Sequence, residues 1–257
     1  MKFLYNIVLI ILLLLLFTGL AQSAPKFDAK RLIRGESLHY NAKWGLLTIG
    51  SAYSQTDKQL YKVGSAVCYK INLGGSTNGL AKLFSLNDKW TSYVDIKTFS
   101  TYKSYRCIRE GKYKLDEIVY FDYVNKRANV NNYNYSSKTF VPYKVYNTGN
   151  YVRDVVAGFM LIRLIDLSKY KKGDKINISG FYKSEGYSID VFIGEKEYVK
   201  TAKNKVLCYK LKPIVPDKKK KDGLKDLEVW VSCDKKQIIT KAVAHLYIGD
   251  LVLEIAS

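Results

Sequence analysis

The sequence is poor in the residues that most often carry metal or nucleophilic chemistry. It has two histidines, His39 and His245, and four cysteines in 257 residues. Two histidines exclude a His-rich metal site, and no CxxC spacing or neighbouring histidine accompanies the cysteines. Both histidines lie inside strand-like patterns, so we interpret them as structural or surface-facing imidazoles. We therefore predict that the protein binds no metal.

Catalytic and cofactor motifs are also missing. The sequence contains no GxSxG, no Walker sequence, no dinucleotide fingerprint and no EF-hand loop. Two carboxylate pairs remain, Asp116/Glu117 and Glu195/Glu197. Adjacent strand residues point to opposite faces, so Asp116 and Glu117 cannot face one another across a groove. Glu195 and Glu197 share a face, but lysines surround them, as in a solvated hairpin. We predict no catalytic residues and no cofactor.

Long hydrophobic runs are absent beyond the first residues. An apolar run from Ile7 to Phe17 follows Met1-Lys2 and precedes small residues up to Ser23. This order is typical of a secretory signal peptide. We predict a signal peptide over residues 1–23 and a single exported domain, periplasmic or secreted, over residues 24–257, without a transmembrane span. The alternative is an uncleaved N-terminal anchor, although the run is shorter than the ~20 residues of a membrane span.

The four cysteines all lie in the exported part. An even number of cysteines in an oxidising compartment predicts two disulfides, and four cysteines allow three pairings. We favour Cys68–Cys107 and Cys208–Cys233, because each pair lies on neighbouring strand candidates. The alternative is that all four are free thiols in the core.

Positive charge dominates, with a formal net charge of +19, but it comes from 35 lysines and only seven arginines. Lysine, asparagine, isoleucine and tyrosine all have codons made largely of A and T, so a biased genome alone would raise lysine. The densest basic stretch runs from Lys196 to Lys241, and its tip is Lys218, Lys219, Lys220 and Lys221. This tip is either a patch for anionic lipid headgroups or acidic glycans, or a solubilising hairpin. No nucleic-acid recognition motif is present, so we exclude nucleic acid as a partner.

Alternating apolar and polar residues predict a mainly β fold. Roughly 12 strand candidates follow one another without regular βα alternation. Gln59–Leu73 is predicted as one strand, Glu110-Gly111-Lys112 as a hairpin turn, and residues 79–85 as at most a short helix. We predict a large curved antiparallel sheet, barrel-like or a sandwich, with one amphipathic helix packed against it.

That helix is predicted over Tyr151–Leu167, where apolar residues recur at helical spacing. Asn150 or Thr148 would cap its start. The chain also holds 22 tyrosines, which suit a carbohydrate- or ligand-binding surface. Tyrosine is also a favoured strand residue, so its abundance has a structural explanation as well.

Several segments, in order, carry a resemblance to a known family. They are Gly35-Glu36-Ser37-Leu38-His39-Tyr40, Gly50-Ser51-Ala52, Phe84 with Asp88, Trp90, Ser92 and Tyr93-Val94-Asp95, Arg109-Glu110-Gly111-Lys112-Tyr113, Arg153-Asp154-Val155-Val156-Ala157, Leu161-Ile162-Arg163, Val229-Trp230-Val231-Ser232 with Asp234, and Gly249.

Over roughly residues 34–256 this order resembles an exported bacterial family known as domain of unknown function 3108. The resemblance implies a periplasmic, β-rich fold and no established activity. It also implies that the recurring helix charges, here Asp154 and Arg163, make buried structural contacts. The Lys218–Lys221 run departs from the family pattern.

These observations favour a non-enzymatic periplasmic protein that binds a hydrophobic or amphipathic ligand of the cell envelope. A lipid or an anionic envelope component is the expected partner, and the oligomeric state stays open. The alternatives are an envelope interaction or structural protein, and an enzyme that uses carboxylates on glycans.

Overall fold

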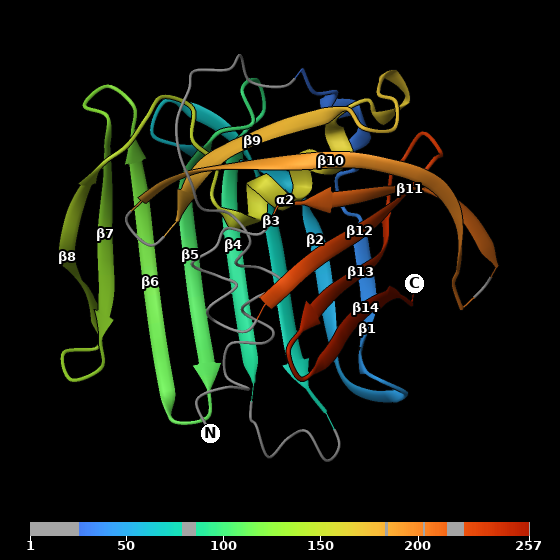
Figure 1. Cartoon of the computed structure of the whole chain (residues 1–257). Coiled ribbons are helices and arrows are strands. Elements are labelled where there is room, and N and C mark those ends of the chain that lie inside the picture. The colour runs from blue at the N-terminus through green and yellow to red at the C-terminus, as the bar shows by residue number, and fades with distance from the viewer. Residues whose placement is uncertain (1–25, 79–85, 183–184, 203, 215–223, 257) are drawn as a thin grey trace.

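The computed structural model describes residues 26–78, 86–182, 185–202, 204–214 and 224–256. Within these ranges the chain forms one antiparallel sheet of fourteen strands around a single α-helix, α2 (Figure 1). The strands are β1 (Ser37–Trp44), β2 (Leu47–Val63), β3 (Ala66–Thr77), β4 (Asn87–Asp95), β5 (Thr101–Glu110), β6 (Tyr113–Asp122), β7 (Arg127–Asn134), β8 (Thr139–Asn147), β9 (Lys175–Tyr182), β10 (Glu185–Lys200), β11 (Lys205–Pro213), β12 (Leu224–Ser232), β13 (Ile239–Leu246) and β14 (Gly249–Ile255). The predicted fold class, a curved antiparallel sheet with one helix, is confirmed.

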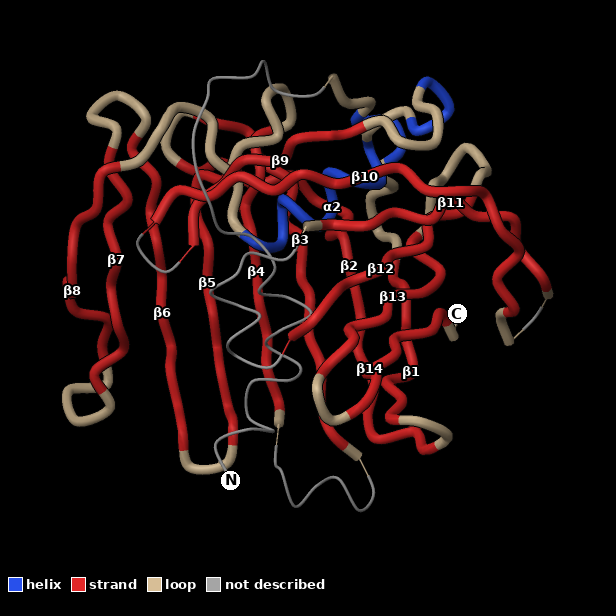
Figure 2. Tube along the Cα trace, in the orientation of Figure 1, coloured by secondary structure: helices blue, strands red, loops and turns tan. Residues whose placement is uncertain are grey.

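The order of the strands explains the shape of the sheet. It runs β8-β7-β6-β5-β4-β3-β2-β1-β14-β13-β12-β11-β10-β9, so the first and last strands of the chain pair in the middle and β8 and β9 form the edges. The sheet curves until β9 and β10 arch over α2, as the tube in Figure 2 shows. The architecture is therefore one strongly curved sheet, and the sandwich alternative does not apply.

The segment that precedes α2 connects β5 to the edge strand β9 through backbone hydrogen bonds. The N–H of Thr101 on β5 donates to the carbonyl of Val152 at 3.0 Å, and the N–H of Phe181 on β9 donates to the carbonyl of Arg153 at 2.8 Å. The ring of Phe181 also packs at right angles to that of Phe121 on β6, with centroids 5.6 Å apart. Extended backbone thus bridges β5 and the edge strand β9, while the two edge strands β8 and β9 do not pair.

The helix is shorter than the sequence pattern predicts. α2 spans Val155–Leu164, and a short 3-10 helix, η4, follows at Leu167–Lys169. The prediction of a start near Asn150 was wrong, because the preceding residues are used as the extended bridge. Asp154 caps the helix instead, and its carboxylate accepts the N–H of Ala157 at 2.9 Å. Nine of the ten residues of α2 are buried, since the sheet surrounds the helix.

Strand alternation places one apolar set on the concave face. Ile71 and Leu73 of β3, Val229 of β12 and Ala242 of β13 are among the residues of the main core around α2. The predicted strand Gln59–Leu73 was wrong as a single element, because Gly64 adopts a left-handed conformation (φ +57°) and turns β2 into β3. The predicted hairpin at Glu110-Gly111-Lys112 is confirmed, since β5 ends at Glu110 and β6 begins at Tyr113.

Three predictions fall outside the described residues: the signal peptide at 1–23, the short helix at 79–85 and the basic tip at Lys218–Lys221. In the described part of the chain, no helix has both the length and the apolar character needed to cross a membrane. A short 3-10 helix, η2 (Ala29–Arg31), lies ahead of the sheet, and the N–H of Asp28 beside it donates to the carbonyl of Leu164 at 2.8 Å.

Candidate ligand-binding site

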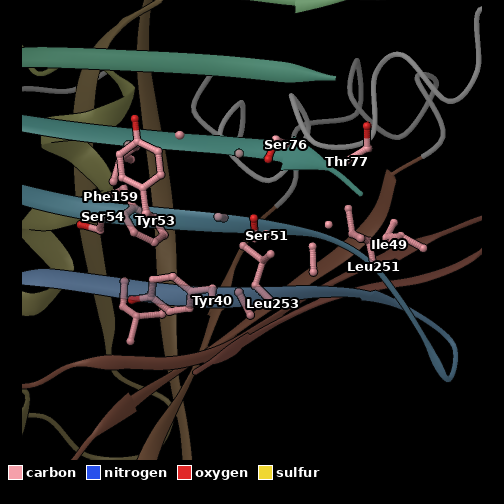
Figure 3. A pocket seen from close by; sticks show the side chains of 18 residues that line it. Tyr40, Ile49, Ser51, Tyr53, Ser54, Ser76, Thr77, Phe159, Leu251 and Leu253 are labelled. Carbon is pink, nitrogen blue, oxygen red and sulfur yellow. The ribbon is translucent and has the colours of Figure 1, made fainter. Parts of the chain in front are cut away.

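An apolar pocket lies on the concave face, between α2 and the part of the sheet where the first and last strands pair. Its walls come from β1, β2, β3, β13 and β14, and Phe159 of α2 covers one end. Figure 3 shows Tyr40 and Phe159 toward one end of the pocket and Ile49 and Leu251 toward the other. The pocket is partly open, with a cavity volume of about 60 Å³.

Small residues in register create this hollow. Ala42 of β1 lies opposite Gly50 of β2, and Ala52 of β2 lies opposite Gly75 of β3. Ala242 of β13 lines the pocket from the other side. A sheet normally fills its concave face with branched side chains, so a run of glycine and alanine leaves the backbone floor uncovered. The sequence signal was present in Gly50-Ser51-Ala52 and Gly74-Gly75, but sequence alone did not show that they lie side by side.

The lining is almost entirely without charge. Leu73, Leu251 and Leu253 line the pocket beside the small residues. The hydroxyl of Ser54 donates to the sulfur of Met160 at 3.6 Å, so this polar group on the lining is directed at the helix. Burial raises the pKa of Tyr40, so the phenol at the end of the pocket stays neutral at physiological pH. Such a lining favours an apolar ligand over an ion.

The two helix charges make contacts with other parts of the fold. Asp154 caps α2 and also accepts the hydroxyl of Thr101 at 3.2 Å. Burial raises the pKa of this carboxyl to about 6, against the hydrogen bond from the N–H of Ala157. Arg163 is 1% exposed and binds Glu36 through two nitrogens, at 2.6 and 3.2 Å.

The structure separates the members of each predicted carboxylate pair. Glu117 faces the concave side and binds Arg106, whereas Asp116 points to the convex side. Burial opposes ionisation of Asp116, but hydrogen bonds from Tyr105, Tyr135 and Arg109 bring the pKa of its carboxyl down to about 2. A carboxylate so fully bound to protein donors is structural.

The second pair is separated by a bulge in β10 between Ile193 and Lys196. Glu195 is two-thirds exposed and pairs with Lys172 at 2.6 Å. Glu197 accepts the indole N–H of Trp230 on the convex face, next to a small apolar cluster around that ring. The two side chains therefore do not act on one ligand.

All four cysteines are free thiols in the structure, so neither predicted disulfide is present. Cys68 lies opposite Asp95 of β4, and Cys107 lies opposite Lys89 at the other end of the same strand. An entire strand separates them, so this pairing was wrong.

The other predicted bridge is also not formed. Cys208 lies opposite Ser232, the last residue of β12, and Cys233 follows the end of that strand. Cys208 belongs to the convex cluster around Trp230, whereas Cys233 packs against the main core around α2. The sequence correctly predicted that the strand of Cys208 and the strand before Cys233 are neighbours, but it did not give their register.

The histidines and the acidic residues form no metal centre. Within the described ranges, no group of three or more histidine, cysteine, aspartate or glutamate side chains is arranged to hold a metal ion. His245 contacts Asp250 at 2.9 Å and Glu228 at 3.5 Å, and His39 contacts Ser37 at 3.2 Å. Both imidazoles thus have partners on the sheet surface.

Comparison with known proteins identifies the family of this chain. A family model described as protein of unknown function DUF3108 matches residues 39–256. The chain belongs to the DUF3108 family. Asp154 and Arg163 lie within the matched range, whereas residues 35–38, also quoted for the resemblance, precede it. No curated protein sequence matches this DUF3108 protein.

Two solved structures are similar to this DUF3108 protein over most of its length. A β-barrel-like protein of the domain of unknown function DUF1849 from Brucella abortus has a TM-score of 0.53 at 9% identity, covering 88% of this chain and 98% of that chain. A Bacteroides fragilis protein with a YmcC-like fold has a TM-score of 0.31 at 11% identity, covering 90% of this chain and 97% of that chain. The first likeness shows a β-barrel-like fold.

Proposed function

We propose that this DUF3108 protein is an exported, non-enzymatic binding protein of the periplasm that takes a hydrophobic or amphipathic molecule of the cell envelope. The observation that carries the proposal is the uncovered floor of the apolar pocket, where Ala42 lies opposite Gly50 and Ala52 lies opposite Gly75. The apolar run at residues 7–17 supports export.

The size of the pocket limits what enters it. A cavity of about 60 Å³ is well below the ~150 Å³ that holds a benzene-sized molecule. One end of an alkyl or acyl chain therefore fits against the floor, while the remainder of the ligand lies outside the mouth. Each methylene that leaves water there contributes about 0.8 kcal/mol.

A fluorescent fatty acid is a suitable probe, read by the rise in its emission on binding, together with mass spectrometry of lipid extracted from the purified protein. Ala52→Leu places a large side chain over the floor and should weaken probe binding by about tenfold or more. Gln55→Leu is the matched control, because Gln55 is exposed on the same strand at the position of opposite parity.

Two outcomes would refute this function. The first is that the purified protein carries no lipid and does not bind the fluorescent fatty acid. Probe binding that Ala52→Leu and Gln55→Leu leave equally strong occurs elsewhere on the surface. Recovery of one reproducible protein partner by crosslinking, without lipid, would favour the interaction-protein alternative.

A further inference from the structure

A second cavity lies on the concave face, on the side of β4 to β8. Its volume is about 170 Å³, and none of the residues that line it lines the apolar pocket. Side chains from β4, β5, β6, β7 and β8 form one wall, and the start of α2 and Phe181 of β9 form the other. This cavity holds an ion pair, unlike the first one.

The ion pair joins Arg106 of β5 to Glu117 of β6, which are directly opposite in register. Nε and Nη2 of Arg106 both contact Oε1 of Glu117, at 2.8 and 2.7 Å. The guanidinium also lies over the ring of Trp90, 5.3 Å from its centroid. The positive charge is thus neutralised in place, so the cavity does not favour an anion.

Acceptor atoms remain after this pairing. Among the described residues no donor contacts Oε2 of Glu117, and the side chain is 15% exposed. Asn132 of β7 lies opposite Glu117 on the same face, and its Oδ1 is buried without a hydrogen-bond partner. Asn132 does not itself line the cavity, so Oε2 of Glu117 is the acceptor that a ligand reaches, and a molecule that supplies hydroxyl groups would be stabilised there.

The other walls are aromatic. Phe121, Tyr146 and Phe181 pack against one another, with Phe181 within 5.6 Å of Phe121 and 6.4 Å of Tyr146 between ring centroids. Tyr143 of β8 also lines the cavity but is 64% exposed, which places it at the mouth. Aromatic faces accept the C–H faces of a saturated ring, and the few polar groups then fix its orientation.

We propose that this cavity binds a neutral, ring-shaped polyol of about the size of one sugar unit. The volume of about 170 Å³ exceeds the ~150 Å³ that holds a six-membered carbon ring. A hydroxyl group of the ring donates to Oε2 of Glu117, while Tyr143 stacks on its exposed side. This site is separate from the apolar pocket and does not depend on what that pocket binds.

Isothermal titration calorimetry of the full chain tests the site with three probes, methyl glucoside, N-acetylglucosamine and myo-inositol. Tyr143→Ala removes the stacking ring and should weaken binding by about tenfold. Because Tyr143 is exposed, the substitution should change the stability of the fold little. Tyr113→Ala is its control, because Tyr113 is 55% exposed at the start of β6 and does not line the cavity.

Two glutamate-to-glutamine variants test the polar side of the cavity. Glu117→Gln exchanges an anionic acceptor for a weaker neutral one and should also reduce affinity, whereas Glu195→Gln, at an exposed pair, should not. Isothermal titration calorimetry with a charged probe tests whether the site prefers neutral ligands. Glucose 6-phosphate should bind no more tightly than methyl glucoside.

Failure of all three neutral probes to bind would overturn the proposal and indicate a cavity filled by water. Binding that both tyrosine variants leave unchanged would overturn it as well. Loss of polyol binding with fatty-acid binding intact, and the reverse for Ala52→Leu, would show that the two sites are independent.

Discussion

Arg163 of α2 and Glu36, just before β1, form a two-pronged ion pair between residues 127 positions apart in the sequence. Nη1 and Nη2 of Arg163 contact the two carboxylate oxygens at 2.6 and 3.2 Å, and Nε donates to the carbonyl of Gln237 at 3.2 Å. The arginine side chain is 1% exposed. One buried residue thus connects the helix to the beginning of the sheet and to the turn before β13.

Removing one partner of this pair should destabilise the fold strongly. Glu36→Ala leaves the guanidinium of Arg163 buried without its counter-charge, and we expect a loss of about 3–5 kcal/mol in the free energy of unfolding. Urea denaturation followed by circular dichroism measures it. The double variant Glu36→Leu/Arg163→Met should cost less than the sum of the single variants, because it removes both charges.

The exposed pair Lys172–Glu195 is the control, since both of its side chains are 68% exposed. Lys172→Ala should change the free energy of unfolding by less than about 1 kcal/mol. Equal effects at the two pairs would contradict a structural role for Arg163.

The cap of α2 should make stability depend on pH in an unusual direction. Burial raises the pKa of Asp154 to about 6 from its ordinary 3.8, so between these values the folded protein holds a proton that the unfolded chain has released. The contribution of this group is present below pH 4 and is lost as the pH rises toward 6. Asparagine caps equally well and does not titrate.

Asp154→Asn should therefore gain stability relative to the wild type over this interval, on the order of 2–3 kcal/mol. Unfolding curves recorded at several pH values measure the difference. Asp166→Asn should show the opposite trend, because hydrogen bonds from Ser168 lower the pKa of Asp166. Parallel pH profiles for wild type and Asp154→Asn would contradict a buried, titrating cap.

Much of the fold could be predicted from the sequence, because local patterns carry it. Alternation marked most strands, and the apolar stripe marked the helix. The start of the helix was missed because residues 152–154 satisfy a helical pattern but lie outside the helix, held by Thr101 and Phe181. The helical spacing within this segment is overridden by its hydrogen bonds to two strands, one about 50 residues earlier in the sequence and one about 30 residues later. A local sequence pattern does not contain such distant contacts.

The candidate sites were harder to predict, because each depends on register. Ala52 and Gly75 form a pocket floor only as cross-strand neighbours, and Arg106 and Glu117 become one ion pair for the same reason. A shift of one residue would send either set to the other face. The expected disulfides failed for this reason too, since candidate strands were identified without their pairing.

Thiol chemistry offers a direct check of that register. All four cysteines are free, so the intact mass should be the same before and after treatment with a reductant, and denatured protein should take up four alkyl groups. In the native state Cys68 and Cys208, both 0% exposed, should resist alkylation. Burial raises the pKa of Cys68 to about 12, which removes the reactive thiolate.

Cys107 and Cys233 are partly exposed and should be modified first in the native protein. Peptide mapping by mass spectrometry distinguishes the sites. A mass increase of two hydrogens for each bridge upon reduction would show disulfides and would contradict the free thiols.

Gly50 tests how closely the floor of the apolar pocket is built. A Cβ at this position would overlap the carbonyl oxygen of Ser76 on β3, and the backbone of Thr77 lies 3.2 Å from it. These atoms belong to the β2–β3 ladder and cannot turn away as a side chain can. We expect Gly50→Ala to lower the free energy of unfolding by about 1–3 kcal/mol. Gln55→Ala, at an exposed position of the same strand that does not line the pocket, should change it by less than about 0.5 kcal/mol. Fatty-acid binding measured at a temperature where both variants are folded should fall only for Gly50→Ala, because forcing β2 from β3 changes the pocket floor. Unchanged stability and binding in Gly50→Ala would mean that the floor is looser than the contact with Ser76 requires.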